Sequence, residues 1–212
     1  IAVLDKYKIS CSKNIYESLN SEVSETPDKD DKIFSRSEFK LIAKPQKALL
    51  KAAEIVEKNK FSSLILSDSI EGESNDIGKV HAAIVKQVNK YAQPSKAPLC
   101  ILSGGETTVT IRSTNGKGGR NTQFLLSLAI ALDSVDNVYA IACDTDGIDG
   151  SEKNAGALLY PDTLKRAHKL GMNPKEFLER NDAYTFFFKL GDLVETGPTF
   201  TNVNDFRAIL IA

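Results

Sequence analysis

Apolar and polar positions along the chain change their spacing repeatedly, which predicts strands alternating with helices. Residues 39–43 (FKLIA) and 62–67 (SSLILS) are short apolar runs typical of buried strands, and residues 46–59 between them carry Ala, Leu, Ile and Val at helical spacing. Pro45 lies where the first run meets the helix, a position that suits a first-turn proline. The pattern predicts a strand–helix–strand unit, which favours a parallel sheet with helical crossovers.

The same alternation continues toward the C-terminus. An acidic loop is expected at residues 68–76, a helix at 77–91, and two strands within 99–111 that are broken at Gly104 and Gly105. The later expected elements are a loop at 112–122, a helix at 123–133, a buried strand at 137–143, helices within 161–171 and 173–180, and a final strand at 206–212. Asn173 is expected to cap its helix, and the aromatic segment 181–191 is expected to pack in the core.

The N-terminal residues follow a different pattern. Residues 1–38 are mixed in character, and residues 24–38 combine charge and Pro27 with few apolar side chains, which indicates a solvated connector without a domain core. The chain starts directly on an apolar run without a methionine. We therefore expect it to be a fragment of a longer protein.

Composition limits the classes of function. The chain has 212 residues, of which 42% are hydrophobic, and this is enough to form one large or two small domains with a core. Its formal net charge is -1, so no broad electrostatic field would attract nucleic acid or an anionic membrane. No run of about 18 apolar residues and no signal peptide is visible, so a cytosolic location is expected. The three cysteines do not suggest a disulfide framework, and two histidines give little material for a zinc site or a catalytic triad. Metal chemistry would therefore need oxygen ligands.

A carboxylate cluster follows the strand expected at residues 137–143. Asp144, Asp146 and Asp149 lie in the sequence DTDGIDG, at the end of a strand where open α/β sheets bind ligands. Their order does not match a calcium EF-hand loop. Two interpretations stay open: a loop that binds a hard cation or hydroxyl groups, and a set of Asx turns that cap their own backbone.

Glycines flank a second group of polar candidates. Gly118 and Gly119 precede Arg120 and a helix, so backbone N–H groups and the guanidinium could hold a phosphate or carboxylate, although neither the P-loop nor the dinucleotide pattern is matched. Gly104 and Gly105 could likewise let an anion approach the backbone beside Glu106. In each case a plain loop or bend is the competing interpretation. Residues 196–205 (TGPTFTNVND) suit either a binding loop or a self-satisfied turn.

Taken together and in order, six segments resemble one family. LSDSIEGE, LSGGETTVTI, GGRNTQFLLSLAIAL, DTDGIDG, NDAYTFF and TGPTFTNVNDF are similar to the glycerate 2-kinases of the MOFRL type, many of which are named hydroxypyruvate reductases. The resemblance runs from about residue 38 to the C-terminus. It implies an α/β fold: a partial Rossmann-like strand-helix-strand segment, residues 1–97, followed by a complete C-terminal MOFRL α/β domain, residues 98–212.

The resemblance also implies a reaction and roles. The family transfers a phosphoryl group from ATP to the 2-hydroxyl of D-glycerate with a divalent cation, Mg²⁺, in a cleft between two domains. Arg120 is then the anion clamp, with Asp144 and Asp146 as further catalytic groups. The other implied roles are phosphate binding by Gly104, Gly105, Gly118 and Gly119, substrate binding by Glu106, Asn202, Asn204 and Asp205, and metal binding by Asp144, Asp146 and Asp149.

Other readings stay open. Family members are about twice this length, so a large part of the N-terminal domain, with an expected active-site lysine, would lie outside this chain. An NAD(P)H-dependent hydroxypyruvate reductase is the alternative enzyme, although no dinucleotide motif follows any expected strand. A non-catalytic C-terminal module is the third. The expected partners are a small hydroxy acid, a nucleotide and the remaining N-terminal domain, without nucleic acid or membrane, and a homodimer is left open.

Overall fold

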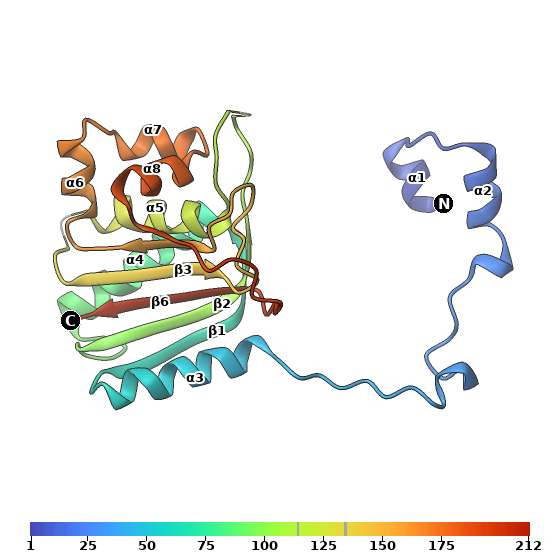
Figure 1. Ribbon diagram of the computed structural model, residues 1–212, viewed down its shortest axis with the longest axis horizontal. Helices are drawn as coiled ribbons and strands as arrows, with labels where there is room; N and C mark the ends of the chain where they lie inside the picture. Colours follow the sequence, from blue (N-terminus) through green and yellow to red (C-terminus); the bar gives the residue numbers. More distant parts are fainter. Residues whose placement is uncertain (114, 134) are drawn as a thin grey trace. The chain divides into compact units, whose positions relative to one another are not determined.

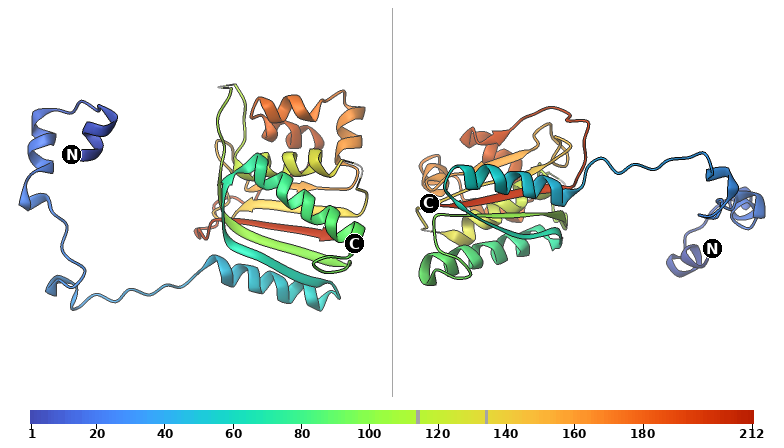
Figure 2. Two further views of the ribbon diagram at one scale, coloured as in Figure 1. Left: turned by 180° about the vertical axis from the view of Figure 1, so that it is seen from behind. Right: turned by 90° about the horizontal axis from the view of Figure 1, so that it is seen from below.

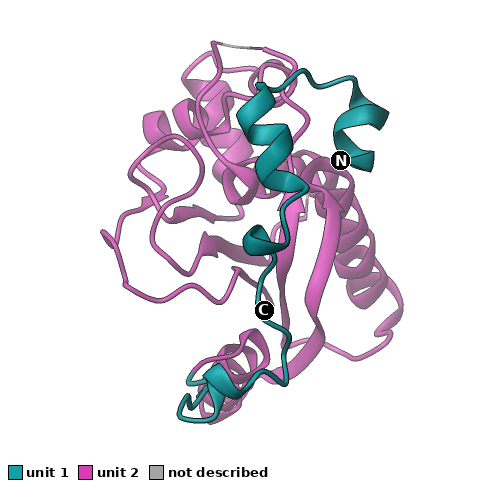
Figure 3. Ribbon diagram, turned by 90° about the vertical axis from the view of Figure 1, so that its right-hand side faces the viewer, with its two compact units in different colours: residues 1–42 teal, residues 43–212 magenta. Residues whose placement is uncertain are grey.

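The computed structural model describes residues 1–113, 115–133 and 135–212, which form two compact units, residues 1–42 and residues 43–212 (Figure 3). The elements of the first unit are α1 (Ala2–Tyr7), α2 (Lys13–Leu19) and the 3-10 turns η1 (Glu22–Ser24) and η2 (Lys32–Phe34). None of residues 1–42, all of which are described, is buried. Residues 24–38 are all exposed, which agrees with the solvated connector expected there.

The second unit is built on one mixed sheet with the strand order β1-β2-β6-β3-β4-β5. Its strands are β1 (Ser62–Glu73), β2 (Leu99–Thr108), β3 (Val138–Asp144), β4 (Gly156–Leu159), β5 (Leu193–Val194) and β6 (Asp205–Ile211). Only β1 and β2 pair in parallel, and the other four pairs are antiparallel. The parallel sheet expected from the sequence is therefore right for the first crossover alone, because β6 returns between β2 and β3 in the opposite direction.

Helices cover both faces of this sheet (Figures 1 and 2). The helices of the second unit are α3 (Pro45–Lys58), α4 (Ser74–Tyr91), α5 (Arg120–Leu132), α6 (Thr163–Lys169), α7 (Pro174–Glu179) and α8 (Ala183–Leu190). Strand β6 shows the two faces: Ala208 and Leu210 pack toward α3, whereas Ile209 and Ile211 join the larger core beneath α4 and α5. The period of two along a strand thus separates two hydrophobic cores.

Three expected segments need correction near the start of the sheet. Residues 39–43 form no strand, because no strand of the described chain pairs with them and Phe39 and Ile42 are exposed. The acidic loop expected at 68–76 is instead the second half of β1 and the first turn of α4, held by pairing as far as Glu73 with Thr108.

The expected break at Gly104 and Gly105 is also wrong, since β2 runs continuously through both. A register shift between Ser67 and Ile70 brings the backbone of β1 against Gly105, where a Cβ atom would lie 2.2 Å from Ile70 backbone atoms. Gly105 has φ of +118°. Glycine is therefore needed there for close strand approach and not for a turn.

Most other expected elements are confirmed. The helices at 46–59, 77–91, 123–133, 161–171 and 173–180 and the strands at 62–67, 137–143 and 206–212 all overlap observed elements. Asn173 caps α7 by accepting a hydrogen bond from the Lys175 backbone. In the aromatic segment Phe186 and Phe187 are fully buried, but Phe188 is exposed. The short strands β4 and β5 were not expected from the sequence.

The expected domain boundary between residues 97 and 98 falls in the connection from α4 to β2. Since β1 and β2 pair across it, the described structure shows a continuous sheet there. The assignment of residues 1–97 to a separate N-terminal domain stays a prediction. Among the described residues, none of the helices is both long and apolar enough to cross a bilayer.

Candidate active site

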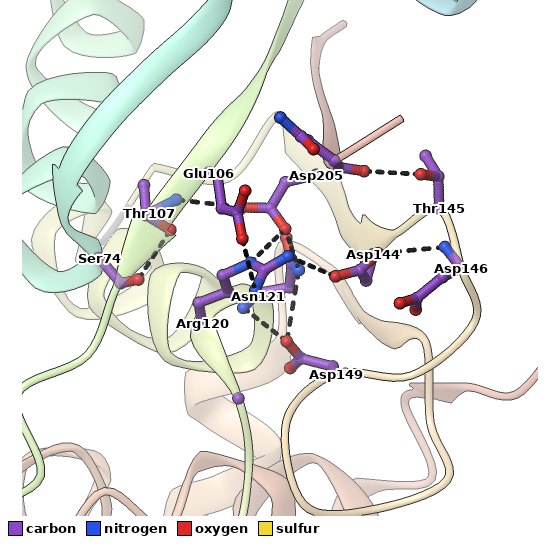
Figure 4. A network of polar contacts seen from close by, with 12 residues as sticks. Ser74, Glu106, Thr107, Arg120, Asn121, Asp144, Thr145, Asp146, Asp149 and Asp205 are labelled. Carbon is purple, nitrogen blue, oxygen red and sulfur yellow. Dashed lines mark hydrogen bonds and ion pairs between the residues drawn. The ribbon is translucent and has the colours of Figure 1, made fainter. Parts of the chain in front are cut away.

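Arg120 is the first residue of α5 and lies among carboxylates from three strands (Figure 4). Its Nε donates to Asp205 Oδ1 over 2.7 Å and its Nη2 to Asp144 Oδ2 over 2.5 Å, while Nη1 lies 3.5 Å from Glu106 Oε1. Burial opposes the charge of Arg120, but the hydrogen bond to Asp205 and the three nearby negative charges outweigh it and raise its pKa. The sheet thus brings together residues that are far apart in the sequence.

Asp149 determines where helix α5 begins. Its Oδ1 accepts from the Asn121 backbone N–H over 2.9 Å, and its Oδ2 accepts from the Thr122 backbone N–H over 2.9 Å and from Thr122 Oγ1 over 2.8 Å. A carboxylate in this position satisfies the free N–H groups of the first turn and complements the helix dipole. Only 1% of Asp149 is exposed, and this burial raises its pKa. Both carboxylate oxygens therefore point at the helix terminus.

Asp205 is the buried centre of the cluster. Besides Arg120, its Oδ1 accepts from Asn121 Nδ2 over 2.8 Å, and its Oδ2 accepts from Arg207 Nη2 over 2.5 Å. The side chains of Asp205 and Arg207 are both 0% exposed. Asp205 therefore links two arginines, one at the surface of the cleft and one inside the protein.

Asp144 and Asp146 occupy the turn that follows β3. Asp144 Oδ1 accepts from the Asp146 backbone N–H over 3.1 Å, and Asp146 Oδ1 accepts from the Ile148 backbone N–H over 2.8 Å. These are the Asx turns of the competing interpretation. Burial raises the pKa of Asp144 to about 6 despite the opposing charge of Arg120. The turn thus uses one oxygen of each aspartate for its own backbone, and the other oxygen of Asp144 accepts from Arg120.

The loop before β6 packs on this same turn. Asn204 O accepts from Thr145 Oγ1 over 2.8 Å, and Asn204 N–H donates to Asn202 Oδ1 over 2.9 Å. Thr199 N–H donates to Asp146 O over 3.0 Å. Asn202 is exposed and Asn204 half-buried. The two polar loops singled out in the sequence therefore adjoin one another, and much of their hydrogen-bonding capacity is used between them.

An open cleft of about 700 Å³ lies on the Glu106 side of Arg120. The polar and glycine positions on its wall are Glu71, Glu106, Thr107, Thr108, Ser113, Gly116, Gly118, Gly119, Arg120, Gln123, Gly150, Ser151 and Asn181. Of the glycines with an expected phosphate role, Gly118 and Gly119 line the cleft, whereas Gly104 and Gly105 are buried within β2 and do not. Gly119 also packs closely on Asp149, where a Cβ atom would lie 2.4 Å from Oδ1.

Asp144, Asp146 and Asp149 are the expected metal ligands. Within the described chain, no three or more His, Cys, Asp or Glu side chains are grouped so that they could hold a metal ion by themselves. Asp144 is paired with Arg120 and Asp149 with the start of α5, which leaves Asp146 as the least committed of the three aspartates. The metal roles of all three stay predictions.

Sequence reasoning missed three residues of this region. Arg207 holds Asp205, Asn121 bridges Asp205 and Asp149, and Glu71 lines the cleft opposite Glu106 in the β1–β2 register. A signal existed for Arg207, because a charged residue within the apolar run FRAILIA lies on the same strand face as Asp205. Glu71 was hidden by the assignment of residues 68–76 to a loop.

Comparisons with known proteins agree with this architecture. A D-glycerate 2-kinase of Thermotoga maritima is 36% identical over 205 residues, covering 97% of this chain and 47% of that protein. An Agrobacterium vitis protein with the provisional name hydroxypyruvate reductase is 51% identical over 175 residues, covering 82% of this chain and 40% of its own length. The chain thus spans less than half the length of either relative.

A crystal structure of a glycerate kinase from Thermotoga maritima matches the whole fold. Its TM-score is 0.86 at 35% identity, covering 100% of this chain and 49% of that one. The MOFRL family model matches residues 99–205, half of the chain, which include Arg120, Asp144 and Asp205. The chain therefore belongs to the MOFRL family.

Proposed function

We propose that this chain is the C-terminal part of a glycerate kinase that transfers a phosphoryl group from ATP to the 2-hydroxyl of D-glycerate. The observation that carries the proposal is Arg120, which is held by Asp205 and Asp144 at the edge of a cleft of about 700 Å³. Glycerate kinases among the relatives support the choice of reaction. In this proposal, residues 1–97 of the chain are the C-terminal part of an N-terminal α/β domain, and residues 98–212 are the MOFRL domain.

Arg120 would act on the anionic group of the substrate or nucleotide. Its Nε and Nη2 are held by Asp205 and Asp144, whereas Nη1 lies 3.5 Å from the exposed Glu106, which lines the cleft together with Arg120. Phosphoryl transfer depends mainly on positioning and on stabilising charge that spreads over phosphate oxygens. An arginine whose orientation is fixed before the ligand binds meets that need. Gly118 and Gly119 would let the ligand approach the backbone beside it.

Mg²⁺ would be held jointly by protein and nucleotide. Mg²⁺ commonly takes one or two carboxylates together with substrate phosphates, and this fits the absence of a larger ligand group in the described residues. Of the three aspartates expected to hold the ion, Asp146 is the one least committed to other contacts, and Asp144 lies two residues before it at the end of β3. The ion would neutralise charge on the phosphate oxygens. Asp146→Asn should then weaken activity at low Mg²⁺, and an unchanged Mg²⁺ titration would remove Asp146 from the metal site.

A coupled assay of the full-length protein tests the reaction directly. D-glycerate with ATP and Mg²⁺ should produce ADP, and hydroxypyruvate with NADH should leave NADH unoxidised. The second arm is needed because the relatives that match at 51% and 48% identity carry the reductase name. NADH oxidation without ADP formation would overturn the kinase assignment in favour of the reductase.

A further inference from the structure

Arg207 is a fully buried arginine that faces the site from inside the sheet. Its Nη2 donates to Asp205 Oδ2 over 2.5 Å and to Thr107 Oγ1 over 3.2 Å, and its Nη1 donates to Gly104 O over 3.4 Å. The guanidinium carbon lies 5.1 Å from the ring centroid of Phe124 on α5. Among the described atoms, Nε has no hydrogen-bond partner. The group is therefore fixed by β2, β6 and α5 together.

Such a pair is a costly way to stabilise a core. Taking an arginine and an aspartate out of water removes the hydration of both, and apolar replacements of buried ion pairs are often equally stable. The burial of Arg207 is strong enough to lower its pKa. A donor without a partner adds to the cost. The Arg207–Asp205 pair is thus better explained by what it positions than by what it adds to stability.

The two carboxylate oxygens of Asp205 accept hydrogen bonds from different partners. Oδ2 accepts from Arg207 and from the Thr107 backbone N–H, whereas Oδ1 accepts from Arg120 and Asn121. Arg207 offsets the negative charge of Asp205, so Asp205 orients Arg120 while adding less negative potential to the cleft. Asp144 and Glu106 are the other two carboxylates beside Arg120.

We propose that Arg207 is a positioning residue for Arg120: it anchors Asp205 and offsets its negative charge, so that Arg120 stays oriented and the potential beside it is less negative toward an anionic ligand. This inference rests on the proposed function, in which the cleft takes an anionic substrate. A residue of this kind touches no ligand. Its loss should weaken the attraction of the anion equally in the ground and transition states, which raises KM more than it lowers kcat.

The experiment uses the full-length protein with Arg207→Met and Arg207→Lys. Arg207→Met removes one of the two arginines that bond to Asp205, and KM for D-glycerate or ATP should rise on the order of tenfold. The lysine variant keeps the positive charge and should recover most of that loss. Arg166→Met is the matched control, because Arg166 is also held by two aspartates but lies outside the site.

A second measurement does not depend on turnover. The Nε–Hε cross-peak of Arg120, assigned with Arg120→Lys, reports its hydrogen bond to Asp205 in a nitrogen-15 NMR spectrum. It should shift in Arg207→Met and stay in place in Arg166→Met. If the wild type transfers no phosphoryl group while the Arg120 signal still moves, the proposed function fails and the positioning role stands.

The opposite results would overturn the inference. If Arg207→Met only lowers the folded fraction, KM stays constant, the NMR signal does not move, and Arg207 is a core residue alone. If that variant does not fold, the neutral but polar variant Arg207→Gln takes its place. A folded Arg207→Gln protein with wild-type KM and an unmoved Arg120 signal would show that the charge of Arg207 does not act on Arg120 through Asp205.

Discussion

Two arginines of this protein are held by aspartates in similar ways, yet their surroundings differ. Arg120 on α5 is 26% exposed and contacts Asp205 and Asp144, and Arg166 on α6 is 30% exposed and contacts Asp192 and Asp162. Each network pairs a partly exposed guanidinium with at least one nearly buried carboxylate. Exposure and partner type therefore do not separate a functional arginine from a structural one.

The difference lies in how completely the donors are used. Arg166 donates from Nε, Nη1 and Nη2 to Asp162, Asp192, Thr163 Oγ1 and Leu190 O, which joins α6 to the end of α8. Arg120 donates from Nε and Nη2, and among the described residues its Nη1 has one longer contact, to Glu106, which also lines the cleft. A guanidinium beside a cleft that keeps N–H donors without a close protein acceptor can bind a ligand. A guanidinium whose three nitrogens all donate within the protein instead stabilises the packing of its helices.

The largest expected effect comes from removing the ligand-facing arginine. Arg120→Ala in the full-length protein should lower kcat/KM on the order of a hundredfold or more, since the charge that stabilises the transition state is lost. Arg120→Lys keeps a point charge without the fork and should recover only part of the activity. Steady-state kinetics at fixed Mg²⁺ measure both. Near-wild-type kinetics for the alanine variant would place Arg120 outside the site.

Arg166→Ala should give the converse result. Asp192 is 6% exposed and would lose its partner, so the free energy of unfolding should fall by about 2–3 kcal/mol. Denaturant unfolding measures that loss, and kcat/KM per folded molecule should stay within about twofold of wild type. A large loss of activity with unchanged stability would erase the distinction drawn between the two arginines.

Among the described residues, a buried histidine, His81, lies close to the Arg120 network and not to the Arg166 network. His81 and Arg207 both contact Phe124, His81 Nδ1 bonds to Ile77 O over 2.8 Å, and Nε2 bonds to Ser103 Oγ over 3.0 Å. Burial, together with the charge of Arg207, lowers the pKa of His81 from its usual 6.5 to about 4. His81 is therefore neutral in the folded protein at neutral pH.

The sign of the pH effect follows from this lowered pKa. Below pH 6.5 His81 is protonated in the unfolded chain, whereas in the folded protein it stays neutral down to about pH 4. The free energy of unfolding therefore falls as the pH falls from 6.5 toward 4. By pH 5 the loss should reach about 2 kcal/mol from this group. Denaturant unfolding of the wild type and of His81→Gln at pH 7 and pH 5 gives the contribution of His81 as the difference between their changes in the free energy of unfolding. Equal pH dependence in the two proteins would contradict it.

The sequence predicted the Arg120 network better than the fold around it. Arg120, Asp144, Asp149 and Asp205 were all singled out, because polar residues at the ends of apolar runs are visible in a single sequence. Their division of labour was not visible. The use of Asp149 as a helix cap depends on a contact between residues 28 positions apart, which no local pattern encodes.

The misplaced elements have a similar cause. Residues 68–73 are polar and acidic, and they are held as a strand only by their pairing with β2, so local propensity favoured a loop. Residues 39–43 are apolar but find no strand to pair with in the described chain. Tertiary pairing therefore decided both cases. The antiparallel return of β6 likewise depends on chain topology and not on its own residues.

The smallest expected effect comes from the exposed carboxylate of each network. Glu106 is 55% exposed and 3.5 Å from Arg120, and Asp162 is 58% exposed and 3.0 Å from Arg166. Because solvent screens exposed pairs, Glu106→Gln and Asp162→Asn should each change the free energy of unfolding by less than about 1 kcal/mol. Of the two variants, only Glu106→Gln should change KM, by about twofold to fivefold, because it removes the negative charge beside Nη1 of Arg120. Equal and unchanged KM values in both variants would mean that the unused donor of Arg120 does not meet the substrate, and that spare donors alone do not identify a functional arginine.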